Sequence, residues 1–126
     1  MNLKTCLLIT DDPDDHDAFS EALSEIASQI ILFVISNSEK ALALLKSKRH
    51  RPDYIFVDLT MYGIRKNFFL NTMSGDFELA GIPIILYGDK TDSTKIEDQF
   101  HLPFLSKDYT YAELRVFLTQ VFKSEA

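Results

Sequence analysis

The chain has 126 residues, enough for one domain with a hydrophobic core, and its 46% hydrophobic and 25% charged residues are typical of globular proteins rather than of disordered or membrane-embedded chains. A net charge of −6 argues against binding to DNA or RNA, whose phosphate backbone is recognised by clustered Lys and Arg. The single cysteine, Cys6, excludes an internal disulfide, and we interpret it as a small buried thiol.

The apolar stretch that follows Met1 to Thr5 is too short for a signal peptide or a membrane span. We therefore expect a cytoplasmic protein that binds neither membranes nor nucleic acids.

Short apolar runs alternate along the chain with longer stretches of helical spacing. The runs predict five strands, at Cys6–Thr10, Ile30–Ile35, Tyr54–Val57, Ile82–Tyr87 and Pro103–Leu105. Nearly continuous apolar runs are typical of parallel strands that are covered on both faces.

The stretches between the runs carry helix signals. Asp12 is a predicted N-cap with Pro13 at the first helical position. A second helix is predicted after Ser36 to Ser38 and ends in the basic run 46–51, and a third signal is the capping box of Thr110 and Glu113. Weaker patterns predict two more helices, at about 64–74 and 92–99.

Repeated strand and helix signals over this length predict a doubly wound α/β fold, with a parallel sheet and helices on both faces. Residues 1–126 are expected to form one domain. In such sheets ligands bind beyond the carboxyl ends of the strands.

Charged residues follow four of the five predicted strands. In chain order they are Asp11 and Asp12, Asp58, Asp89 after Gly88, and Lys107. Because carboxyl ends of parallel strands share one edge, these carboxylates would repel one another unless a hard cation lay between them. One acid that stays protonated would also relieve the repulsion. Mg²⁺ is the natural candidate for a cation, and we predict a site formed by Asp11, Asp12, Asp58 and the backbone carbonyl of Thr60.

A carboxylate beside Mg²⁺ and an ammonium suits phosphoryl transfer to aspartate, because positioning and charge neutralisation supply most of that catalysis. Asp58 is then the nucleophile. Each acid alone also fits an ordinary turn or N-cap, and we expect Asp12 to serve as both cap and metal ligand. Asp14, Asp15 and Asp17 are assigned to the helix dipole. The histidines, His16, His50 and His101, have no zinc-ligand spacing.

Four segments resemble the receiver domains of two-component response regulators. They are LLITDDPDDH (7–16), PDYIFVDLTM (52–61), IPIILY (82–87) and FLSK (104–107). The resemblance implies a flavodoxin-like sheet of strand order 2-1-3-4-5 and a phosphoryl group accepted on Asp58 from a histidine kinase or phosphotransfer protein. It further implies that Asp11 and Asp12 hold Mg²⁺ and that Lys107 pairs with the phosphoryl oxygens.

The resemblance also implies a domain without an output domain, a monomer or weak homodimer that signals to a downstream protein target and is not an enzyme in its own right.

Several positions depart from the family pattern. Gly88 stands where the family has a Ser or Thr hydroxyl that contacts the phosphoryl group, and Asp89 adds a carboxylate beside it. Phe104 lacks the hydroxyl of some family members and is expected to pack inside. Tyr62, Lys66 and Asp108 replace residues that are usually Pro, Gly and Pro, respectively.

Three functions follow from these observations. The retained Asp11, Asp12, Asp58 and Lys107 favour a phosphoacceptor, whereas Gly88 and Asp89 favour a degenerate receiver that binds partners independently of phosphorylation. A phosphatase of the haloacid dehalogenase type is the third, but it needs an acid two residues after the nucleophile, where this chain has Thr60.

Overall fold

The computed structural model describes residues 3–27, 29–89 and 102–123. The strands are β1 (Lys4–Ile9), β2 (Ile30–Ile35), β3 (Tyr54–Asp58), β4 (Ile84–Gly88) and β5 (Phe104–Ser106). The helices are α1 (Pro13–Ile26), α2 (Ser38–Ser47), α3 (Lys66–Gly75) and α5 (Tyr111–Lys123). The helix predicted at 92–99 lies outside the described residues.

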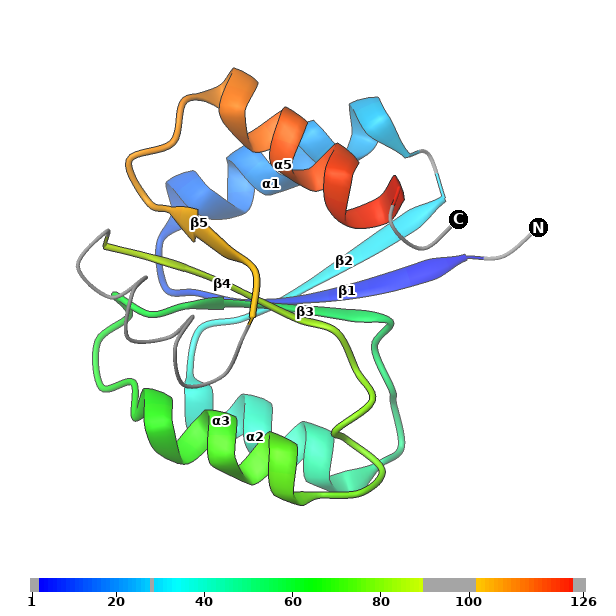
Figure 1. The fold of residues 1–126 in the computed structure, drawn as a ribbon, viewed down its shortest axis with the longest axis vertical. Coiled ribbons are helices and arrows are strands. Elements are labelled where there is room, and N and C mark those ends of the chain that lie inside the picture. Colours follow the sequence, from blue (N-terminus) through cyan, green and yellow to red (C-terminus); the bar gives the residue numbers. More distant parts are fainter. Residues whose placement is uncertain (1–2, 28, 90–101, 124–126) are drawn as a thin grey trace.

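The five strands form one parallel sheet in the order β2-β1-β3-β4-β5. Helices α1 and α5 cover one face, and α2 and α3 cover the other (Figure 1). The predicted doubly wound sheet and its order 2-1-3-4-5 are therefore confirmed. No helix among the described residues has the length and apolar character needed to cross a bilayer.

Two buried clusters hold the layers together, one on each face of the sheet. Leu7 and Ile9 of β1 point toward α2 and α3, whereas Cys6 and Leu8 point toward α1 and α5. Alternation of side chains along a strand produces this division. Cys6 is fully buried, as predicted, and burial together with the nearby Asp53 raises the pKa of its thiol to about 12.

The helix termini follow the predicted signals. The Asp12 side chain accepts from the N–H of Asp14 at the start of α1, and Pro13 occupies the first turn. Thr110 and Glu113 form the reciprocal capping box at the start of α5, with distances of 2.9 and 3.1 Å. β2 has the predicted bounds, whereas ends of the other strands differ from the prediction by one or two residues; β4, for example, starts at Ile84 rather than at residue 82.

The prediction that all strands are covered on both faces is wrong for β2. In this edge strand Ile31 and Phe33 are exposed, on the face that carries α2. Continuous apolar sequence predicts burial, but the sheet order places β2 at the margin, where coverage by helices ends.

Candidate functional site

Asp58 is the last residue of β3, which lies between β1 and β4 in the sheet. Its side chain is completely buried and accepts hydrogen bonds on both carboxylate oxygens. Thr10 Oγ1 (2.7 Å) and Lys107 Nζ (2.9 Å) donate to Oδ2. The backbone N–H (2.9 Å) and Oγ1 (2.7 Å) of Thr60 donate to Oδ1. A buried carboxylate with these donors is stabilised in its charged form.

The pKa of Asp58 reflects two opposing effects. Burial alone would raise it, but the hydrogen bonds from Thr60, Lys107 and Thr10 outweigh that effect and hold the pKa below the ordinary value of an aspartate. Asp58 is therefore ionised at neutral pH.

Lys107 lies at the centre of the site. Its backbone N–H donates to Gly88 O (2.8 Å), which ties the end of β5 to the end of β4. Its ammonium lies 2.9 Å from Asp58, 3.4 Å from Asp12 and 3.3 Å from Asp15. Partial burial opposes the charged form of Lys107, but the carboxylates prevail and raise its pKa above the usual value.

Asp15 lies in the first turn of α1, as its predicted helix-dipole role requires, and it also belongs to this site. Its side chain is 5% exposed, accepts from Tyr109 Oη at 2.6 Å and approaches the Lys107 ammonium. The signal in the sequence was its position, since Asp15 precedes Phe19 by four residues and shares the buried face of α1 with Ala22. An acid on an apolar helix face needs a partner.

The other predicted residues lie around this centre. Asp12 combines its role as N-cap with an ion pair to Lys107, while Asp11 Oδ2 accepts from the N–H of Tyr62 at 3.3 Å. Thr60 contributes through its backbone N–H and its hydroxyl, which also accepts a hydrogen bond from Lys107 at 2.8 Å. The role of its backbone carbonyl as a metal ligand stays a prediction. Sequence reasoning missed both this hydroxyl and that of Thr10.

Carboxylates are ligands that a hard cation prefers, but in this structure the side chains of these acids are not arranged around a common point. Among the described residues no group of three acidic, histidine or cysteine side chains is close enough to hold a metal ion. The ammonium of Lys107 lies between Asp12 and Asp58. Even so, in the described part of the chain Asp12, Asp15 and Asp58 share this one ammonium as their ion-pair partner. The surplus of negative charge and the oxygen ligands fit Mg²⁺.

Gly88 makes a close backbone approach possible at the end of β4. A Cβ at this position would lie 3.1 Å from Leu59 Cβ and 3.7 Å from the ring of Phe104. Phe104 is partly buried and packs against the core, as predicted. Asp89 is exposed. The site therefore has neighbouring hydrophobic side chains where the family has a hydroxyl.

Solved structures of response regulators share the fold of this chain. The phosphorylated cyanobacterial phytochrome response regulator RcpA matches it with a TM-score of 0.81 and 20% identity, over 97% of this chain and 93% of RcpA. The chemotaxis response regulator CheY4 of Vibrio cholerae matches with a TM-score of 0.76 and 19% identity, over 95% of this chain and 99% of CheY4.

A third structure is the receiver domain of the sensor histidine kinase PA1611 from Pseudomonas aeruginosa, with a magnesium ion in its active-site cleft. It matches with a TM-score of 0.71 and 17% identity, over 94% of this chain and 97% of that receiver. No protein-family model and no curated protein matches the sequence significantly. The comparisons thus confirm, at the level of the fold, the resemblance to receiver domains of response regulators.

Proposed function

We propose that residues 1–126 act as a receiver domain that takes a phosphoryl group on Asp58 and signals by binding another protein. The observation that carries this proposal is the buried, ionised Asp58 at the carboxyl end of a central strand, with the ammonium of Lys107 at 2.9 Å. A carboxylate nucleophile beside a fixed cation is what phosphoryl transfer needs.

In the proposed reaction the bond between phosphorus and its donor nitrogen or oxygen breaks, and a bond from phosphorus to a carboxylate oxygen of Asp58 forms. Thr60 and Thr10 hold that carboxylate in place, and Lys107 balances charge on the phosphoryl oxygens. Because Asp58 is completely buried, Thr60 or Lys107 must move aside before a donor can reach it.

Mg²⁺ is the proposed cofactor. Asp11, Asp12, Asp58 and the carbonyl of Thr60 would hold it, and when bound it would neutralise charge between phosphate and carboxylates. The PA1611 receiver, whose structure contains magnesium in the cleft, supports this choice. For Asp12 to bind Mg²⁺, its side chain would have to rotate away from Lys107, with which it forms an ion pair in this structure.

The proposed partners are a histidine kinase or phosphotransfer protein, which supplies the phosphoryl group, and a downstream protein target. The domain is then a signalling module rather than an enzyme with a product of its own.

One observation favours a second function, an interaction module that works without phosphorylation. Leu59 and Phe104 lie around Gly88, where the family has its switch hydroxyl. A phosphoryl group on Asp58 would then have no hydroxyl to draw inward, and the two states of a switch would not differ at this position.

Incubation with Mg²⁺ and acetyl phosphate, followed by intact-mass spectrometry, tests the first function. We expect one phosphoryl group on the wild-type chain and none on Asp58→Asn. An unmodified wild-type chain, beside a receiver of known activity that is modified, contradicts the phosphoacceptor function. If Asp58 is modified but amide chemical shifts near Gly88 and Phe104 stay unchanged, the second function is favoured.

A further inference from the structure

The strand β2 forms one edge of the sheet and has none of the features that usually protect an edge. Its sequence, IILFVI, contains no charge, no Pro and no Gly. Two of its side chains are largely exposed, Ile31 at 41% and Phe33 at 54%. Exposed apolar edge strands of this kind pair with another strand when one is available.

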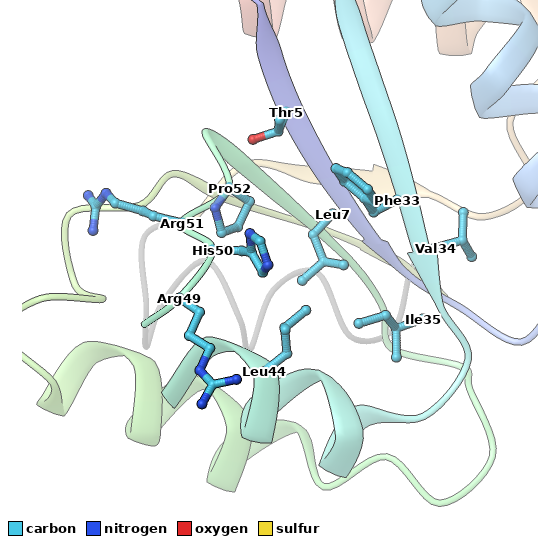
Figure 2. Close-up of a pocket in the computed structure, with 10 residues that line it drawn as sticks. All are labelled: Thr5, Leu7, Phe33, Val34, Ile35, Leu44, Arg49, His50, Arg51 and Pro52. Carbon is cyan, nitrogen blue, oxygen red and sulfur yellow. The ribbon is translucent and has the colours of Figure 1, made fainter. Parts of the chain in front are cut away.

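Open hollows flank β2 on both faces of the sheet. One of about 450 Å³ lies beside Phe33, Leu44 and His50, and in Figure 2 the Phe33 ring stands at its margin while Val34 points to the other face. The second, of about 500 Å³, lies between Leu23 of α1 and Ile30. No described segment covers the outer edge of the strand between these hollows.

Hydrogen bonds to β1 fix which residues of β2 face outward. The N–H of Lys4 donates to Gln29 O (2.9 Å) and that of Thr10 donates to Ile35 O (3.1 Å). Backbone groups alternate in direction along a strand, so the odd-numbered residues of this segment face β1. The N–H and C=O groups of Ile30, Leu32 and Val34 therefore face the outer edge.

We propose that β2 pairs with β2 of a second copy of the chain, antiparallel and centred on Leu32. In this register Leu32 lies opposite its own copy, and Ile30 lies opposite Val34. Every outward N–H and C=O of the three residues then has a partner, because opposed residues of this type exchange two hydrogen bonds.

The same register accounts for the two exposed side chains. Ile31 of one copy lies opposite Phe33 of the other, in the non-hydrogen-bonded positions where cross-strand side chains approach most closely. Aromatic and β-branched residues form favourable cross-strand pairs. A shift by one residue would oppose outward backbone groups to inward ones. A shift by two residues would leave Ile30 or Val34 without an opposed residue inside the strand, so the register centred on Leu32 pairs the most backbone groups.

Charge complementarity favours a second copy over a strand of unspecified sequence. Lys4 begins β1, and Arg49 follows the end of α2, so both lie at the amino edge of the sheet beside β2. Asp11 follows β1, and Glu39 is in the first turn of α2, so both lie at the carboxyl edge. Antiparallel pairing brings the basic edge of each copy beside the acidic edge of the other.

Analytical ultracentrifugation over about a hundredfold range of concentration tests the proposal. We expect the average mass to rise from the monomer toward the dimer. Ile31→Lys and Phe33→Lys should each remain monomeric, because a charge on an exposed edge strand opposes pairing. Both side chains are already exposed, and circular dichroism should show that both variants stay folded.

Two matched variants place the same charge elsewhere. Val116→Lys on α5 and Phe77→Lys after α3 replace apolar side chains that are 58% and 97% exposed. Both should dimerise as the wild type does. A wild type that stays monomeric, or a dimer that survives lysine at 31 and at 33, overturns the proposal.

Mild oxidation tests the register with single-cysteine variants in a Cys6→Ala background, because Cys6 lies beside Leu32 in the β1–β2 pairing and would compete for a disulfide within one chain. Leu32→Cys should form a disulfide-linked dimer, because residues opposed in such a pair have Cα atoms about 5.5 Å apart, within disulfide range. Ile30→Cys, two residues away on the same face, should not, since its copy lies four residues further along. Equal cross-linking of the two variants overturns this register. Asp58 takes no part in the pairing, so these results do not depend on its phosphorylation.

Discussion

Lys107 forms ion pairs with three carboxylates, those of Asp12, Asp15 and Asp58, through one ammonium. In Lys107→Met these acids lose their shared cation while the aliphatic part of the side chain is kept. We expect the free energy of unfolding at neutral pH to fall by roughly 2 to 3 kcal/mol, less than for a fully buried pair because the side chain is partly exposed. Urea denaturation measures this change.

Lys48→Met is the matched control. Lys48 also lies between two acids, Asp76 and Glu78, but at the surface of the protein. Its loss should cost clearly less than the loss of Lys107, because ion pairs at the surface contribute little to stability. Equal losses for the two variants would show that the site lysine has no special role in stability.

The lowered pKa of Asp58 makes stability depend on pH in a defined direction. Its contribution is complete above the ordinary aspartate pKa of 3.8 and is lost as the pH falls through the lower value of the folded state. The free energy of unfolding of the wild type should therefore decline below about pH 4 more steeply than that of Asp58→Asn. Urea titrations between about pH 6 and pH 2 check this slope, and identical slopes contradict the assignment.

Which residues form the site could be predicted only in part. Asp11, Asp12 and Lys107 follow strands and Asp58 ends one, so the topology alone brings them to one edge. Asp15 lies within a helix, and its partner Tyr109 is 94 residues away in the sequence, so no local pattern could join the two.

At the scale of elements, Gly88 fixes how closely the end of β4 approaches the segment after β3. Gly88→Ser places a Cβ 3.1 Å from that of Leu59, which is itself buried and has little room to move. We expect a loss of about 1 kcal/mol in the free energy of unfolding, because overpacking outweighs the reduced entropy of the unfolded chain. Thermal and urea unfolding measure it.

Gly75→Ser provides the comparison, since a Cβ at Gly75 meets no atom within 4 Å. It should change stability little. A second comparison is the double variant Gly88→Ser with Leu59→Gly, which removes the Leu59 Cβ itself and should lose less than the sum of the two single variants because the crowded contact is gone. Additive losses would show that Leu59 is not the obstacle.

The elements themselves could be predicted where local chemistry decides them. The caps at Asp12, Thr110 and Glu113 form as their sequence signals indicate. Strand boundaries could not be fixed to the residue, because pairing with neighbouring strands decides where a strand begins. Pro83 illustrates this: it lacks an N–H, and β4 begins at the following residue, while Pro83 O accepts from Ile55 N.

At the scale of the whole molecule, the surplus of negative charge at one edge predicts a stabilising effect of divalent cations. Under the proposed metal site, Mg²⁺ at about a hundredfold above its Kd adds about 2.7 kcal/mol to the free energy of unfolding. Differential scanning calorimetry should therefore show a Tm that rises with MgCl₂ and returns after chelation.

Asp11→Asn removes a proposed ligand and should abolish most of that rise. Asp17→Asn, which removes an exposed acid on α1, should keep it. Sodium chloride at equal ionic strength separates binding from general screening. A rise of the same size in both variants contradicts the proposed ligands.

The net charge of −6 gave no indication of where charges gather in the molecule. The topology decides where charges gather, because the carboxyl ends of all five parallel strands lie at the same edge of the sheet. It also places β2 at the margin of the sheet. Hydrophobic pattern predicted the layers correctly but could not distinguish a central strand from an edge strand, because both have the same apolar composition.

The rate of chemical modification of the buried Cys6 thiol can measure how often the sheet opens. The residue lies on β1, between Leu32 of β2 and Tyr54 of β3. With a pKa near 12 and no exposed surface, it cannot react with a thiol reagent while the sheet is intact. The rate at which Cys6 is modified therefore reports how often β1 separates from its neighbours, and any variant that weakens the sheet will be labelled faster.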